Sequence, residues 1–274
     1  MKNKNEFTIK ELCDMKYQDK NLVIPLGYAN KKKLFFIDFS DVSGLFITGT
    51  TGTGKSVFID DLIVGLMHKN NPSQIKFLML DPKKVELGEY NGINYLLDDK
   101  NNPSLKNKNK VLLDILKMLE YRIKNLVLTQ HRSINGYNRV EEEKWPHIFI
   151  VVDEGSDIIK MKDTYEVFSK VLDFGQYVGV HLLFATNSYL KDYSDSNFIK
   201  KFDYRITFDL ASLEQEEYID IDGSSSLKGE GNALIKCSNG KVYKFKSPYV
   251  KDEEINEVVK KNRWIIVKRI IIIK

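Results

Sequence analysis

The sequence predicts an α/β domain in which a mostly parallel β-sheet is covered by helices on both faces. Apolar runs bounded by turn residues recur along the 274 residues, which is the pattern of strands buried on both faces. Stretches with helical periodicity lie between these runs, as the crossover connections of a parallel sheet require. The first run passes into a helical stretch through a glycine-rich loop. The runs expected to be strands are 44–49, 75–80, 147–154, 180–186 and 204–210.

The segments between and beside these strands follow from the same patterns. Residues 56–69 and 110–130 repeat apolar positions at helical spacing. Residues 21–40 hold two apolar segments joined by a lysine-rich turn, which predicts a β-hairpin. Residues 229–250 predict another hairpin, because Asn239-Gly240 is a dipeptide typical of tight turns.

The length and composition predict one large folded domain rather than several. Hydrophobic residues make up 42% of the chain and charged residues 29%, which excludes a mainly disordered protein. We expect the domain to occupy residues 22–250, after a flexible segment at 1–21 and before a tail at 251–274. The polar stretch 99–110 is expected to be a disordered loop.

Charge and cysteine content narrow the partners and the compartment. Lys and Arg number 42 against 38 Asp and Glu, a net charge of +4, so binding to nucleic acid would depend on local patches. Cys13 and Cys237 are the only cysteines. We therefore expect no zinc site and no disulfide framework, which fits a reducing cytoplasm. No apolar stretch approaches about 20 residues, so we expect neither a signal peptide nor a membrane-spanning helix.

The glycine-rich loop has the pattern of a phosphate-binding loop. Gly49, Gly54, Lys55 and Ser56 satisfy G-x-x-x-x-G-K-[ST] between an expected strand and an expected helix. Glycines allow a tight turn whose N–H groups face a polyphosphate, and the helix N-terminus adds its positive end. The residues expected to bind ATP are Gly49, Thr50, Thr51, Gly52, Thr53, Gly54, Lys55, Ser56 and Val57.

Carboxylates for hydrolysis are expected at the end of the 147–154 strand. Lys55 would contact the β- and γ-phosphates and Ser56 would ligate Mg²⁺, with Asp153 in the metal shell. Glu154 would polarise the attacking water, and this Asp-Glu order indicates an ATPase rather than a kinase. Asn187, at the end of another strand, would sense the γ-phosphate, although a polar residue there is frequently only a turn former.

The order of motifs along the chain resembles the motor domain of the FtsK/SpoIIIE DNA translocases. The resemblance spans residues 22–240. It is carried by "GTTGTGKS", "FLMLDPKKVELGEYNGINYLL", "LEYRIKNLVLTQHRSINGYN", "IFIVVDEGSDII", "GVHLLFATN", "YRITFDLAS" and "GEGNAL". It implies a RecA-like P-loop ATPase fold with ATP and Mg²⁺ as cofactors, and a homo-oligomeric ring, usually of six subunits, that moves along double-stranded DNA.

Carried over position by position, the family's Asp-Pro-Lys falls on Asp81, Pro82 and Lys83. The other matched positions are Glu86, Tyr90, Arg122, Arg132, Gly136, Tyr137, Asn138 and Arg205.

Several positions depart from the family pattern. Gly155 stands where the family has phenylalanine, and residues 187–189 replace its Gln-Arg-Pro. An arginine that resembles a trans-acting finger is expected shortly after the 204–210 strand, and Glu216 or Glu217 occupies its place. A ring ATPase needs an arginine from the neighbouring subunit at the γ-phosphate. Arg205 is therefore the first substitute, as a catalytic residue acting in trans, and Arg132 the second.

A stand-alone motor of this type resembles the small ATPases of plasmids, phages and integrative elements, which serve replication or conjugative transfer. Double-stranded DNA would be contacted by the loops at 187–201 and 130–139, which combine basic and aromatic residues. Two alternatives stay open: a coupling ATPase that delivers a DNA–protein substrate to a secretion channel without threading the DNA itself, or an ATP-binding adaptor for a replication initiator. A replication initiator, a relaxase or a secretion-channel protein is the corresponding partner. The expected location is the cytoplasm, with recruitment to the membrane by a partner.

Overall fold

The computed structural model describes residues 7–15, 22–29, 33–83, 86–97, 108–160, 162–187 and 196–263. Most of the loop expected at 99–110 and most of the candidate DNA loop at 187–201 lie outside the described residues, as do parts of the two terminal segments.

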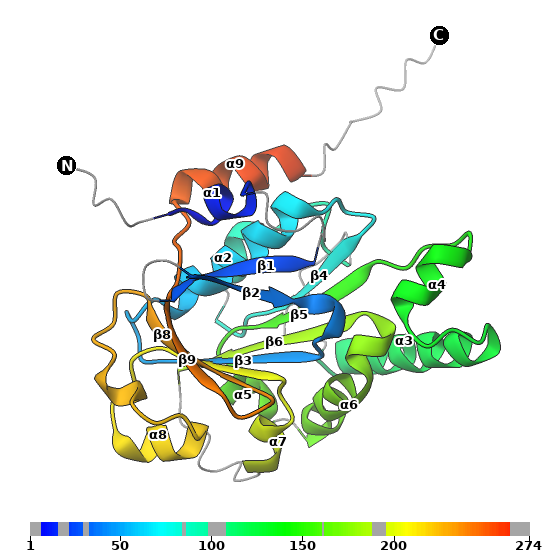
Figure 1. Cartoon of the computed structure of the whole chain (residues 1–274). Coiled ribbons are helices and arrows are strands. Elements are labelled where there is room, and N and C mark those ends of the chain that lie inside the picture. Colours follow the sequence, from blue (N-terminus) through cyan, green and yellow to red (C-terminus); the bar gives the residue numbers. More distant parts are fainter. Residues whose placement is uncertain are drawn as a thin grey trace.

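The described strands form one nine-stranded sheet, in the order β2-β1-β9-β8-β7-β3-β6-β5-β4 (Figure 1). The strands are β1 (Val23–Ala29), β2 (Lys33–Asp38), β3 (Gly44–Thr48), β4 (Ile75–Leu80), β5 (His147–Val152), β6 (Val180–Thr186), β7 (Tyr204–Thr207), β8 (Asn232–Cys237) and β9 (Val242–Lys246). The helices are α1 (Ile9–Cys13), α2 (Lys55–Lys69), α3 (Lys108–Leu128), α4 (Ile134–Val140), α5 (Gly155–Ile159), α6 (Lys162–Val178), α7 (Ser196–Lys200), α8 (Leu213–Ile219) and α9 (Asp252–Asn262).

The five strands predicted from apolar runs form the parallel part of this sheet, in the order β7-β3-β6-β5-β4. Every residue of β3, β5 and β6 is buried, as strands covered on both faces require. The two predicted hairpins are also present. They pair with each other and with β7 in antiparallel register and so extend the same sheet. The predicted fold class is therefore confirmed.

Two apolar layers cover the sheet. On one face α2 packs beneath the short helices α1 and α9, as the upper layer of Figure 1 shows, and Phe58 of α2 is among the fully buried residues of that layer. On the other face α3, α5, α6 and α7 pack around Phe168 and Phe184. Each face of the sheet therefore has its own core.

Short helices in both terminal segments pack on the first layer. Thr8 caps α1 with its hydroxyl, and Ile9 and Leu12 are fully buried. Helix α9, in the segment expected to be a tail, buries Ile255 and Val259. No helix within the described residues is long and apolar enough to cross a membrane.

Candidate active site

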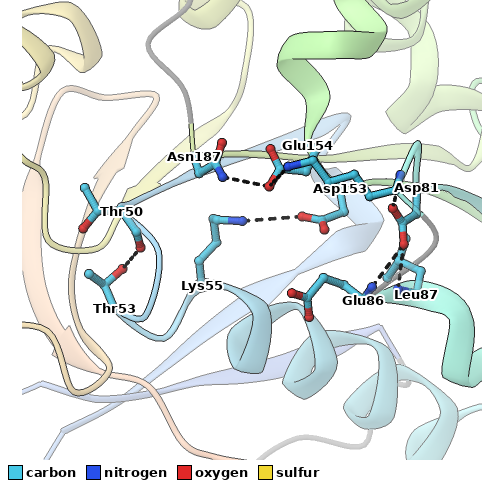
Figure 2. Close-up of polar contacts among 10 residues, drawn as sticks. Thr50, Thr53, Lys55, Asp81, Glu86, Leu87, Asp153, Glu154 and Asn187 are labelled. Carbon is cyan, nitrogen blue, oxygen red and sulfur yellow. Dashed lines mark hydrogen bonds and ion pairs between the residues drawn. The ribbon is translucent and has the colours of Figure 1, made fainter.

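The phosphate-binding loop joins β3 to α2 at the carboxyl edge of the sheet (Figure 2). Gly49 and Gly54 have φ of 156° and 109°. A Cβ on Gly49 would lie 2.7 Å from Cβ of Phe208, so the residue that follows β7 leaves no room for a side chain there. The loop is closed on itself, because the Thr53 hydroxyl donates to the Thr50 carbonyl over 2.7 Å. The loop is therefore a tight turn that requires glycine at position 49, as the sequence predicts.

The start of α2 faces this loop without a side-chain cap from the described residues. Gly54 is its N-cap and Lys55, Ser56 and Val57 begin the helix. The first N–H groups of a helix have no partner within the helix, and together they favour an anion. Thr51 and Gly52, at the tip of the loop, are exposed. The helix start and the loop thus present backbone donors of the kind that bind phosphate.

Lys55 and Asp153 form a buried ion pair beneath the loop. Lys55 Nζ lies 3.5 Å from Asp153 Oδ1, and the two side chains are 7% and 2% exposed. Burial raises the pKa of Asp153, and the Lys55 cation acts in the opposite direction. Asp153 supplies a carboxylate and Ser56, the residue after Lys55 in α2, supplies a hydroxyl. Both are oxygen ligands of the kind that Mg²⁺ takes, so the residues fit the predicted metal.

Glu154 follows Asp153 in the left-handed conformation, with φ of 55°. Its Oε1 accepts a hydrogen bond from Asn187 Nδ2 over 2.8 Å, and Lys83 Nζ lies 3.3 Å from the same oxygen. Figure 2 shows Asn187 and Glu154 pointing toward each other beside the Lys55–Asp153 pair. Three strand ends thus bring together residues 83, 154 and 187.

Gly155, the departure from the family's phenylalanine, also has a packing cause. A Cβ at this position would lie 2.2 Å from Cζ of Phe184, whose ring fills the space next to the start of α5. The Phe184 ring of β6 therefore leaves no room for a side chain on the residue after Glu154.

Asp81 organises the turn after β4. Its carboxylate accepts hydrogen bonds from the backbone N–H groups of Lys83, Glu86 and Leu87, at 2.9, 3.1 and 3.2 Å. The resemblance identified Asp81 and Lys83 as matched positions without giving them a role. The contact of Lys83 with Glu154 was missed, because only the pairing of β4 with β5 brings the two residues together.

Arg205 contacts residues of its own chain in this structure. Its guanidinium donates to the Ile219 carbonyl over 3.0 Å and pairs with Asp220 at 3.3 Å, and its side chain is 11% exposed. Glu216, at the place of the expected finger, accepts hydrogen bonds from the N–H groups of Gly223 and Ser225, at 2.7 and 2.8 Å. These hydrogen bonds lower the pKa of Glu216.

The matched residues before β5 hold the segments that lead into β5 and β6. Arg122 is buried and donates to the carbonyls of Val178 and Pro146. Asn138 exchanges two hydrogen bonds with the Trp145 backbone, and the Tyr137 ring stacks on Trp145 at 3.8 Å. Arg132, in the loop between α3 and α4, is exposed.

A family model for FtsK/SpoIIIE matches residues 11–217. The chain belongs to the FtsK/SpoIIIE family. Among curated relatives, the DNA translocase FtsK of Lactiplantibacillus plantarum is 32% identical over 255 residues, covering 88% of this chain and 32% of the relative. The DNA translocase FtsK of Rickettsia typhi is 27% identical, covering 94% and 40%. This FtsK/SpoIIIE chain thus spans less than half the length of these relatives.

Solved structures agree with the fold of the family. The cytoplasmic domain of the type VII secretion ATPase EccC from Thermomonospora curvata superposes with a TM-score of 0.76 at 20% identity, covering 95% of this chain and 35% of that one. The pCW3 conjugation coupling protein TcpA superposes with a TM-score of 0.69 at 17% identity, covering 90% and 72%. At such identities the likeness establishes the ATPase fold alone.

Proposed function

We propose that this protein is a DNA-stimulated ATP hydrolase that acts as a motor on double-stranded DNA. The observation that carries the proposal is the arrangement at the ends of β3, β5 and β6, where the phosphate-binding loop, a buried Lys55–Asp153 pair and the Glu154–Asn187 contact lie together. Membership of a family whose curated relatives are named DNA translocases supports DNA as the substrate.

The proposed roles follow from the position of each side chain. Residues 49–57 bind the phosphates of ATP through backbone N–H groups and Lys55. Ser56 and Asp153 hold Mg²⁺, which when bound neutralises charge on the phosphates. Glu154 orients the attacking water and accepts a proton from it, and Asn187 positions the Glu154 carboxylate.

The assembly is proposed on the same basis. We infer a homo-oligomeric ring, hexameric as in the family, in which residues 22–250 form the motor and the exposed Arg139 of the 130–139 loop contacts DNA phosphates. Arg205 or Arg132 acts in trans at the neighbouring subunit's ATP. The motor serves replication or transfer of a mobile element in the cytoplasm, and a partner recruits it to the membrane where transfer takes place.

The test measures ATP turnover with and without double-stranded DNA over a range of protein concentrations, together with displacement of a DNA triplex. DNA-stimulated turnover with triplex displacement supports the motor. Turnover that depends on a channel protein would support a coupling ATPase, and ATP binding without turnover would support an adaptor. Glu154→Gln is the matched control, since it removes the proposed base without removing the phosphate-binding loop.

A further inference from the structure

Each acidic residue at the end of β5 is paired with its own lysine. Asp153 pairs with Lys55 at 3.5 Å, and Glu154 pairs with Lys83 at 3.3 Å. The first lysine belongs to the phosphate-binding loop and has the role described above. Lys83 lies on the turn after β4, and neither the sequence motifs nor the comparisons give it a role.

The partners of Glu154 among the described residues, Asn187 and Lys83, lie on opposite sides of it. In the sheet, β5 lies between β6 and β4. Strand β6 neighbours β3 and its phosphate-binding loop, whereas β4 is an edge strand on the side of β5 away from that loop. Asn187 follows β6 and Lys83 follows β4, and both contact Oε1 of Glu154. The amide therefore holds the carboxylate from the side of the loop, and the ammonium holds it from the side away from the loop.

The backbone of Lys83 is fixed while the end of its side chain is accessible. Its N–H donates to Asp81 Oδ1, so the turn that carries it is anchored to a residue that is 7% exposed. The Lys83 side chain itself is 55% exposed, whereas that of Glu154 is 13% exposed. An ion pair of this kind is weak and is screened by salt, so it can be exchanged within a working cycle.

We propose that Lys83 restrains Glu154 and thereby sets the rate of ATP hydrolysis in the absence of DNA. The inference rests on the proposed function, because it concerns the residue that orients the water. A carboxylate held by an ammonium is a poorer acceptor for water and is drawn away from the phosphate-binding loop. Lys83 is thus a positioning residue, which acts on the reaction through Glu154.

The contact itself is tested without ATP or DNA. Acetylation of lysines by an N-hydroxysuccinimide ester is followed by mass spectrometry in the full chain, with exposed Lys117 as the internal reference. Relative to Lys117, labelling of Lys83 is expected to rise about two- to fivefold in Glu154→Gln, since that variant lacks the anion. An unchanged ratio would overturn the proposal whether or not the protein hydrolyses ATP.

The consequence is tested by steady-state turnover without DNA. Lys83→Met is expected to raise kcat about two- to fivefold, the range that a partly exposed ion pair can hold back, with KM for ATP unchanged. Lys83→Arg keeps the cation and is expected to retain the wild-type kcat, and Lys117→Met controls for loss of an exposed lysine. Loss of structure cannot raise kcat, so a merely structural role predicts the opposite sign.

The outcomes separate this inference from the proposed function. A fall or no change in kcat for Lys83→Met, or an equal rise in Lys83→Arg, contradicts the restraint. Full turnover in Glu154→Gln instead contradicts the assignment of Glu154 in the proposed function, while the labelling ratio still reports on the Lys83–Glu154 contact.

Discussion

Replacing Lys55 with methionine removes the cation from a buried ion pair and leaves Asp153 without it. The two side chains are 7% and 2% exposed and their charged atoms are 3.5 Å apart. Removing one member of such a pair typically costs about 3–5 kcal/mol, because the remaining charge is buried and uncompensated. Methionine retains most of the lysine volume, so the loss comes mainly from charge rather than from a cavity.

Protonation of Asp153 limits the loss of unfolding free energy in Lys55→Met. The loss therefore depends on pH. Burial raises the pKa of Asp153 and Lys55 opposes that shift, so the substitution raises the pKa further. Keeping a proton that the unfolded chain, with a pKa of about 3.9, would release costs about 1.36 kcal/mol per pH unit above that value. The limit is thus about 4 kcal/mol at pH 7 and about 1.5 kcal/mol at pH 5. The pKa of Asp153 is higher in the folded state than in the unfolded chain. The stability contributed by its proton is therefore fully present below about pH 4 and is lost as the pH rises through the folded-state pKa.

The assay is urea unfolding of wild type and Lys55→Met at pH 5 and pH 7 without nucleotide. The difference in unfolding free energy is expected to be about 3–4 kcal/mol at pH 7 and about 1 kcal/mol at pH 5. The double variant Lys55→Met with Asp153→Asn removes both charges and is expected to lose the pH dependence. An equal loss at the two pH values, or a double variant as pH-sensitive as the single one, would refute the reasoning.

Three further predictions concern the chemistry, the assembly and the packing. Glu154→Gln is expected to bind ATP normally but to hydrolyse it at least about 100-fold more slowly, measured by equilibrium binding and turnover; loss of binding would assign Glu154 to the metal instead. Turnover per subunit is expected to rise steeply with protein concentration and with DNA, and mixing Arg205→Ala with Lys55→Ala subunits should partly restore it. No rescue would remove support for Arg205 as the trans residue. Gly155→Ala is expected to lower the unfolding free energy by about 1–3 kcal/mol, since its Cβ would lie 2.2 Å from the Phe184 ring. In the double variant Gly155→Ala with Phe184→Ala, the loss of unfolding free energy is expected to be smaller than the sum of the two single losses. An additive loss would contradict the steric cause.

The sequence was sufficient for the elements whose signal is local. Apolar runs identified the parallel strands, and the Asn239-Gly240 turn identified the second hairpin, because burial on two faces and turn chemistry both leave a short-range pattern. The Lys83–Glu154 contact and the Gly155–Phe184 contact were not predictable in this way. They join residues that are adjacent only because β4 pairs with β5 and β5 with β6.

The segment after β7 shows why the trans arginine could not be assigned from the alignment of motifs. Glu216 fastens α8 to the turn at Gly223 and Ser225 through its carboxylate, and an arginine there would lose these acceptor contacts. Arg205 is occupied by Ile219 and Asp220 of its own chain, so it would have to exchange both contacts to reach another subunit.

Arg132 is exposed in the loop between α3 and α4. Unlike Arg205, it would not have to give up contacts with described residues of its own chain to reach another subunit. Exposure therefore favours Arg132, whereas the resemblance places Arg205 first. Mixing each arginine-to-alanine variant with Lys55→Ala separates the two, because only the residue that crosses the interface can be supplied by a subunit whose own phosphate-binding loop is inactive.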